Sequence, residues 1–399
     1  MELLFGRLNE EKRAALAALA ACVEACFPLP ARFAARLPAD IAALSRLLTS
    51  ARSERDGGYL SGGRALSAYL RYFLPWNVYK LCVLFSGDAA PVLCPPVRDG
   101  VVCADLGSGT LAVPIALWIC FPALRKVRLT FYCVDKNARA LDAGQAVFAA
   151  LAQKTEGAGA GCWDIRLVKN EISRFRGAGD GGLDFVYAFN VYNEIYAPIK
   201  QGDAGALALF AGKTARTLCA LLRAGGRVCV AEPGVPAAGQ FLSRLRGAFI
   251  EGGCELRLPC PHRLVCPAAG GRRGKKWCHF VFGTEDAPAS LHALSQKARL
   301  SKEKITLSFM LAEKPAGAAS KTAVPEGAGG VLRLRALSAP VALSGGKRGV
   351  YACSRAGLAL VCGDSDFCRA FVPGALLTCP SPAEKVRDSK SGALLVAAQ

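Results

Sequence analysis

Short apolar runs alternate with helical stretches through the middle of the chain. Each run is rich in β-branched or aromatic residues and ends in a polar or glycine turn. Buried strands that alternate with helices are typical of a parallel sheet covered on both faces. We interpret five runs as such strands: residues 101–106, 129–134, 165–168, 183–189 and 227–231. The pattern therefore predicts an α/β fold with a mostly parallel, doubly wound sheet.

Two later runs, residues 279–282 and 305–312, are close enough in sequence to form an antiparallel strand pair at the edge of this sheet. The segment 254–278 before them is rich in Gly, Pro and Cys, and we expect neither helix nor strand there.

The pattern changes along the chain and predicts its domains. Ala/Leu-rich stretches broken by Pro and Gly predict helices before the first strand, and three prolines between residues 91 and 96 mark the change. We expect a helical N-terminal domain (1–90), a sheet domain (91–314) with the cysteine-rich insertion (254–278), a linker (315–330) and a small β-rich C-terminal region (331–399).

Composition and charge narrow the classes of protein. Of 399 residues, 52% are hydrophobic and 20% charged, which excludes a disordered or collagenous chain. Lys and Arg outnumber Asp and Glu by 50 to 31, and a net charge of +19 favours a phosphate-rich partner such as nucleic acid. The alternative is a codon bias toward arginine. The N-terminus lacks the pattern of a secretory signal, and the uncharged stretch 106–124 contains Pro114 and Pro122, so we expect a cytoplasmic protein with no membrane partner.

A glycine loop follows the first predicted strand. The sequence Asp105-Leu106-Gly107-Ser108-Gly109 ends that strand and precedes a helix, and glycines at such a turn let the backbone approach a ligand closely. Asp135 ends the second strand, where a carboxylate can bind a ribose diol, although it could instead cap the next helix. The D-x-G-x-G motif followed by a strand ending in Asp resembles the Rossmann-like S-adenosylmethionine-dependent methyltransferases. The resemblance implies that Asp105, Gly107 and Gly109 border the amino acid part of the cofactor and that Asp135 holds its ribose.

Polar residues end the fourth predicted strand, at the sheet edge where open α/β sheets bind ligands. Asn190, Asn193 and Glu194 are the candidates for the acceptor side of a methyl transfer, with Asn190 orienting the acceptor and Glu194 taking a proton. Methyl transfer depends mainly on proximity and in-line alignment, so a strong base is not required. The alternative is that Asn193 and Glu194 cap the next helix.

Three cysteines in the insertion lie outside apolar runs, where burial in a core does not explain them. Cys260, Cys266 and Cys278 have a C-x5-C-x11-C spacing, which leaves zinc, an iron-sulfur cluster and free thiols open. His262, His279 or a distant cysteine would supply a fourth ligand.

The same insertion is strongly basic. Residues 257–304 contain ten Lys or Arg and three Asp or Glu, a net charge of +7, and they include a basic run at 272–276 beside Trp277. This composition suits RNA phosphates and an unpaired base, and the alternative is a solvated loop.

Several motifs together resemble the methyltransferase-like family associated with the small ribosomal subunit of bacteria and mitochondria. They are C-P-H-x3-C-P, W-C-H-F, L-S-K-E-K-I, N-V-Y-N-E and V-A-E-P-G, within residues 65–314. The resemblance implies a 4Fe-4S cluster held by Cys260, Cys266, Cys278 and a tail cysteine, which matches Cys353. Cys362, Cys368 and Cys379 are the other tail candidates.

We therefore expect a monomeric protein that acts on or with small-subunit ribosomal RNA and supports ribosome assembly and translation. As an enzyme it would transfer a methyl group to RNA from S-adenosyl-L-methionine, and it would hold a 4Fe-4S cluster, with zinc as the alternative. The rival hypothesis is a non-catalytic assembly factor that uses the same fold and cluster as an RNA-binding platform.

Overall fold

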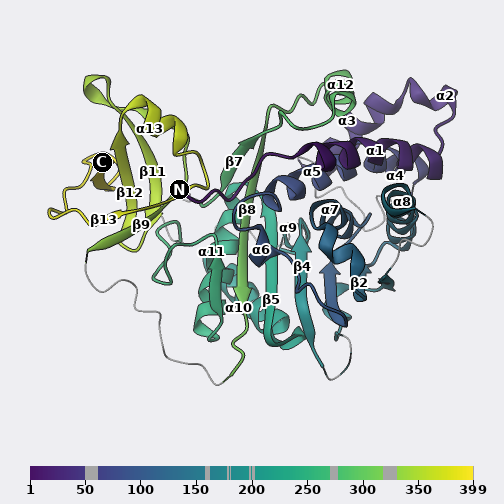
Figure 1. Cartoon of the computed structure of the whole chain (residues 1–399), viewed down its shortest axis with the longest axis horizontal. Helices are drawn as coiled ribbons and strands as arrows, with labels where there is room; N and C mark the ends of the chain where they lie inside the picture. The colour runs from purple at the N-terminus through teal and green to yellow at the C-terminus, as the bar shows by residue number, and fades with distance from the viewer. Residues whose placement is uncertain are drawn as a thin grey trace.

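The computed structural model describes residues 1–49, 62–157, 162–177, 179, 181–196, 199, 203–269, 277–317 and 330–398. Figure 1 shows three parts: helices near the N-terminus, a central sheet flanked by helices, and a smaller β-rich unit that ends the chain. No helix among the described residues is long and apolar enough to cross a bilayer.

The N-terminal part is helical, as predicted. Asn9 Oδ1 accepts a hydrogen bond from the backbone N–H of Lys12, and this cap starts the first helix. A π-helical turn, Tyr69–Phe73, joins two helices into one continuous segment, in which Pro75 lies in the first turn of the second helix. The helices are α1 (Glu10–Cys26), α2 (Ala31–Ala34), α3 (Leu37–Leu48), α4 (Gly63–Ala68), α5 (Leu74–Leu84) and α6 (Ala90–Leu93).

The central sheet has eight strands in the order β3-β2-β1-β4-β5-β8-β6, and β7 also pairs with β8. The first five strands in this order are parallel, and β8 runs antiparallel to β5. The strands are β1 (Val101–Leu106), β2 (Leu129–Asp135), β3 (Trp163–Lys169), β4 (Leu183–Phe189), β5 (Leu222–Pro233), β6 (Glu255–Leu258), β7 (Phe280–Gly283) and β8 (Lys304–Glu313). The predicted α/β fold and the antiparallel pair at the sheet edge are confirmed.

Strand β6 corrects the prediction for the cysteine-rich insertion, where no strand was expected. Its residues pair with β8 through Glu255 opposite Glu313 and Leu256 opposite Ala312. Only Leu258 of its four residues is buried. The segment therefore has no apolar run, which is the signal that would have predicted a strand.

Helices cover both faces of the sheet and form two cores. On β4, Phe185 and Tyr187 contribute to the core that the N-terminal helices share, whereas Val186 and Ala188 contribute to the opposite core. This alternation explains why the whole of β4 is buried. The flanking helices are α7 (Ala112–Cys120), α8 (Ala138–Glu156), α9 (Tyr192–Ile195), α10 (Ala204–Leu221), α11 (Pro236–Glu251) and α12 (Ala289–Lys297).

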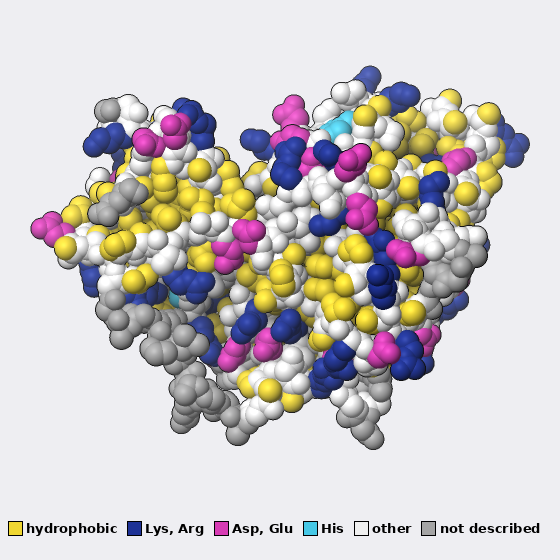
Figure 2. Space-filling view, in the orientation of Figure 1, with side chains coloured by type: hydrophobic (Ala, Val, Ile, Leu, Met, Phe, Trp, Pro, Cys, Tyr) yellow, Lys and Arg dark blue, Asp and Glu magenta, His cyan; other side chains and the backbone are white. Residues whose placement is uncertain are grey.

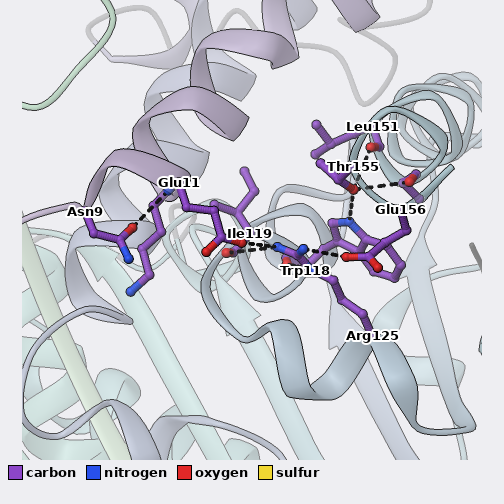
Figure 3. A network of polar contacts seen from close by, with 10 residues as sticks. Asn9, Glu11, Trp118, Ile119, Arg125, Leu151, Thr155 and Glu156 are labelled. Carbon is purple, nitrogen blue, oxygen red and sulfur yellow. Dashed lines mark hydrogen bonds and ion pairs between the residues drawn. The ribbon is translucent and has the colours of Figure 1, made fainter.

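Arg125 joins helices α1, α7 and α8 at the base of the first core (Figure 3). Its guanidinium donates to the carbonyls of Trp118 at 2.8 Å and Ile119 at 3.4 Å. It also pairs with Glu156 at 2.7 Å and with Glu11 at 3.7 Å. Through its ion pair with Glu11, Arg125 links α1 to the polar contacts between α7 and α8, in addition to the apolar packing of these helices.

The C-terminal unit is a six-stranded sheet with a core of its own. Its strand order is β13-β9-β11-β12-β14, and β10 pairs with β11. The N-terminal segment reaches this unit, since Glu2 and Leu376 exchange backbone hydrogen bonds (Figure 1). The elements are β9 (Val331–Ala336), β10 (Val341–Ala342), β11 (Arg348–Ser354), β12 (Gly357–Gly363), α13 (Ser365–Ala370), β13 (Leu376–Pro380) and β14 (Leu394–Ala397).

Candidate functional site

A cavity of about 380 Å³ opens at the carboxyl ends of β1 to β4. Its lining follows the strand order: Ile172 comes after β3, Asp135 ends β2, Gly107 and Gly109 follow β1, and Asn190 follows β4. Its volume is in the range of small-molecule sites, and its place is where open α/β sheets bind ligands. An elongated ligand could therefore extend across all four strands.

The glycine loop after β1 forms the floor of this cavity. Gly107 and Gly109 have φ angles of +78° and +50°, which favour glycine. A Cβ atom on Gly107 would lie 2.4 Å from a methyl group of Val191, so the turn after β4 can approach only because Gly107 has no side chain. Leu111, at the place of the third glycine of a dinucleotide-binding loop, has a φ of 60° and is fully buried.

Asp105 and Asp135 both line the cavity. Burial raises the pKa of Asp105 to about 7, the charge of Asp135 raises it as well, and the nearby Ser108 opposes the shift. Burial also raises the pKa of Asp135, and backbone N–H groups oppose the shift. Asp135 accepts hydrogen bonds from the N–H of Asn137 at 2.8 Å and of Gly109 at 3.0 Å, so it ties the two loops together.

The alternative reading of Asp135 as a helix cap is not what the structure contains. Asn137 caps α8, because its side chain accepts a hydrogen bond from the N–H of Ala140 at 3.0 Å. The Asp135 carboxylate therefore binds the two loops and lines the cavity, and it does not cap α8.

Two of the three acceptor-side candidates line the cavity. Asn190 and Glu194 do so, whereas Asn193 is buried and is absent from the described lining. Neither Asn193 nor Glu194 caps α9. Glu232 takes that part, since its carboxylate accepts hydrogen bonds from the N–H groups of Tyr192 at 2.8 Å and Asn193 at 3.2 Å. Burial raises the pKa of Glu232 to about 8.

Three cavity residues from the N-terminal helices were not singled out in the sequence: Tyr69, Asn77 and Lys80. Lys80 Nζ donates to Asn190 Oδ1 at 3.1 Å, and Asn190 Nδ2 donates to Asn77 at 3.4 Å. Asn190 itself has a φ of +57°. Lys80 is the one charged residue of α5, which is otherwise apolar and largely buried, and a lone lysine in such a helix was the signal that could have found it.

The thiols of Cys260, Cys266 and Cys353 lie near enough to Cys278 to act on its pKa, but the four described side chains are not placed as ligands of one metal ion. Burial raises the pKa of the Cys278 thiol well above its usual range, and the neighbouring thiols Cys260, Cys266 and Cys353 raise it further. His262 Nε2 lies 3.3 Å from Cys353 Sγ. Among the tail candidates, Cys368 lies in the core of the C-terminal unit instead.

Two arginines flank these thiols. Arg246 Nε donates to Cys260 Sγ at 3.2 Å, and its Nη2 donates to the carbonyl of His262. Arg335 donates to the carbonyl of Pro259 at 3.0 Å. In the part of the chain that the structure describes, no group of three or more His, Cys, Asp or Glu side chains is spaced to hold a metal ion.

The structure describes only part of the predicted RNA-binding segment, residues 257–304. The basic run at 272–276 lies outside the described residues. Trp277 is held within the protein, since its Nε1 donates to the carbonyl of Gly234 at 3.1 Å and its ring stacks on His279 with centroids 5.0 Å apart.

The strand order and the cavity decide the fold class. A sheet in the order 3-2-1-4-5, followed by an antiparallel strand beside β5, bears its cavity over the glycine loop after β1. The fold is that of the class I methyltransferases. This agrees with the α/β prediction made from the apolar runs and the D-x-G-x-G motif.

Comparisons with known proteins give one family and a set of similar folds. Residues 213–333, under a third of the chain, match the family described as mitochondrial small ribosomal subunit Rsm22. No curated protein matches the chain in sequence.

Solved structures of methyltransferases are similar in fold. A protein of Thermoplasma acidophilum described as a methyltransferase is 12% identical, with a TM-score of 0.33 over 55% of this chain and 70% of that one. A sarcosine dimethylglycine methyltransferase of Galdieria sulphuraria is 14% identical, with a TM-score of 0.30 over 63% and 88%. The 16S rRNA methyltransferase KamB is 15% identical, with a TM-score of 0.31 over 57% and 94%. These scores are low, and the fold class rests on the strand order.

Proposed function

We propose that this chain binds S-adenosyl-L-methionine at the carboxyl ends of β1 to β4 and acts on or with small-subunit ribosomal RNA. The observation that carries the proposal is the order of the cavity lining, from Ile172 after β3 to Asn190 after β4. Ile172 would contact the adenine, Asp135 the ribose, and Asp105 with the glycine loop the amino acid part.

The residues fit this cofactor. Gly109 has open space where a Cβ atom would lie, with Asp135 Oδ2 the nearest atom at 4.0 Å, so a ligand can approach the backbone there, whereas Gly107 makes room for Val191. Asp135 is held in place by two N–H groups, which fixes its carboxylate at the cavity. When bound, the cofactor supplies a methyl group on a positively charged sulfur atom.

On the acceptor side, Glu194 and Asn190 would orient the nucleophile, and Glu194 would accept its proton. Glu232 holds the turn that presents both residues, since it binds the N–H groups of Tyr192 and Asn193. Transfer to RNA is the form of this function that the small-subunit family match favours.

The test is methyl transfer from labelled cofactor to purified small ribosomal subunits. We expect incorporation with the wild-type protein and none with Asp135→Ala, while both proteins associate with the subunit. Retained methylation by Asp135→Ala would contradict the ribose assignment, and absence of cofactor binding by the wild-type protein would contradict the function.

The contacts of the Asn190 side chain favour a second candidate function, that of a non-catalytic assembly factor. Each polar atom of the Asn190 side chain already has a protein partner, Lys80 or Asn77, so only one N–H and one lone pair remain to orient an acceptor. Under this hypothesis the wild-type protein binds the cofactor and the small subunit but transfers no methyl group to immature or mature subunits.

We also propose that Cys260, Cys266, Cys278 and Cys353 hold a 4Fe-4S cluster, with zinc as the alternative. What supports it is the donor set: the four thiols act on one another, and Arg246 and Arg335 oppose the burial that raises the pKa of Cys353. As placed, the four side chains do not form a metal-binding group, so binding would require them to move. Protein purified without oxygen should be brown, with iron and sulfide in equal amounts. Colourless protein with stoichiometric zinc would support the alternative, and metal-free protein would exclude both.

The RNA partner is supported by charge and by the family match at residues 213–333. On the face in Figure 2, Lys and Arg side chains lie among Asp and Glu on both the central part and the C-terminal unit. This face therefore offers scattered phosphate contacts rather than one continuous basic patch. Binding to small-subunit RNA that weakens steeply with salt is the expected result.

A further inference from the structure

Lys80 brings a buried positive charge to the cavity from an element outside the sheet. Its side chain comes from α5, is 8% exposed and lines the cavity. An ammonium group has three N–H donors. Among the described residues, the one acceptor bound to it is Asn190 Oδ1, at 3.1 Å. The remaining donors are therefore available to an oxygen atom of a ligand.

A buried ammonium with so few partners is costly in a folded protein, because burial removes its hydration. The shift of its pKa reflects this cost: burial lowers the pKa of Lys80 to about 8, the charge of Lys302 lowers it as well, and Glu232 opposes the shift. Lys80 still carries a proton at pH 7. An anionic group in the cavity would offset the cost of burial.

The same cavity contains a buried carboxyl group at a neighbouring strand. Asp105 is near the end of β1, and β1 pairs directly with β4, which ends just before Asn190, the partner of Lys80. Asp135 lies on the other side of β1, at the end of β2. The cavity lining thus includes the carboxyl group of Asp105 near the end of β1, the ammonium of Lys80 beside the end of β4, and the carboxyl group of Asp135 at the end of β2.

Opposite charges in one cavity complement an α-amino acid, which carries an ammonium and a carboxylate on one carbon atom. We propose that Lys80 binds the carboxylate of the amino acid part of the cofactor while Asp105 binds its ammonium. This inference rests on the proposed function and adds that the N-terminal helices complete the cofactor site. Asn190 positions Lys80 through the hydrogen bond between their side chains, and the two residues bind the carboxylate together.

The experiment compares two ligands that differ in the amino acid part. S-adenosylhomocysteine carries it, and 5′-methylthioadenosine lacks it. Calorimetric titration of Lys80→Met should give a dissociation constant for S-adenosylhomocysteine about 10- to 100-fold weaker than wild type, the effect of losing a charged hydrogen bond. The constant for methylthioadenosine should change by less than about threefold.

Lys126→Met is the matched control. Lys126 is exposed and lies outside the described cavity lining, so both ligands should keep their wild-type constants. Lys80→Arg keeps the charge and should keep the preference for S-adenosylhomocysteine over methylthioadenosine.

The outcomes separate this inference from the function on which it rests. If Lys80→Met binds S-adenosylhomocysteine as wild type does, or weakens both ligands equally, Lys80 does not bind the carboxylate, although the cofactor site stands. If the wild-type protein binds neither ligand, the proposed function fails and this inference fails with it. Reversible partial unfolding would raise the apparent dissociation constants of both ligands by the same factor, so the ratio of the two constants decides the result.

Discussion

Lys80 Nζ and Asn190 Oδ1 lie 3.1 Å apart, although 110 positions separate the two residues in the sequence. The contact joins the N-terminal helix α5 to the carboxyl end of β4 and holds Asn190 at a φ of +57°. The helices before the sheet are thus part of the wall of the candidate cofactor site, and both hypotheses for the function depend on this contact.

The ribose assignment predicts a selective loss in Asp135→Ala. The variant loses the hydrogen bonds to Gly109 and Asn137 as well as the ligand contact, so cofactor binding should weaken at least about 10-fold. The control is Asp142→Ala on α8, whose side chain pairs with Lys169 and is 55% exposed. Calorimetry on both variants checks the result, and equal affinities would refute the assignment.

Binding of S-adenosylhomocysteine should depend on pH with two limbs. Asp105 is charged above its pKa of about 7, and Lys80 is charged below its pKa of about 8, so binding should be strongest between these values. Asp135 raises the pKa of Asp105, and Lys302 and Glu232 shift that of Lys80, so all three contribute to the positions of the limbs.

Two variants assign these limbs. Asp105→Asn should remove the loss of affinity at low pH, and Lys80→Met should remove the loss at high pH. A high-pH limb that persists in Lys80→Met belongs to the amino group of the ligand or to Glu232, whose pKa burial raises to about 8, and would contradict the role of Lys80.

The cluster proposal predicts that Cys260→Ser lowers the iron content and visible absorption of protein purified without oxygen, with a loss of RNA binding or of folding. Cys162→Ser is the control, because Cys162 is exposed and lies before β3, and it should keep the wild-type iron content. A colourless but fully active Cys260→Ser protein would remove the cluster from the function.

Arg125 should contribute strongly to stability. Arg125→Met leaves the carbonyls of Trp118 and Ile119 and the carboxylate of Glu156 without their donor, and the site is buried. We expect the free energy of unfolding to fall by about 2–4 kcal/mol in urea titrations. Arg128→Met, in which an 80% exposed partner of Asp99 is replaced, should cost less than about 1 kcal/mol. Equal losses in the two variants would show that the buried network adds nothing.

The local pattern of apolar residues was enough to predict much of the sheet. Strands β1 and β4 begin and end where the apolar runs do, at Val101–Leu106 and Leu183–Phe189, because strands buried on both faces must be apolar throughout. The glycine loop was predictable for the same kind of local reason, since a turn with positive φ favours glycine. Asp105 and Asp135 followed because the ends of parallel strands lie at one edge.

Only the tertiary structure decided which distant residues meet. Strand β6 escaped prediction because most of its side chains are not buried, and its partners on β8 lie more than 50 positions later. Asn77 and Lys80 on α5, and Tyr69 on the π-helical turn before it, reach the cavity because α5 packs on α7. A sequence pattern records periodicity and local turns, whereas a binding site depends on contacts between segments that only the packing of helices on the sheet brings together.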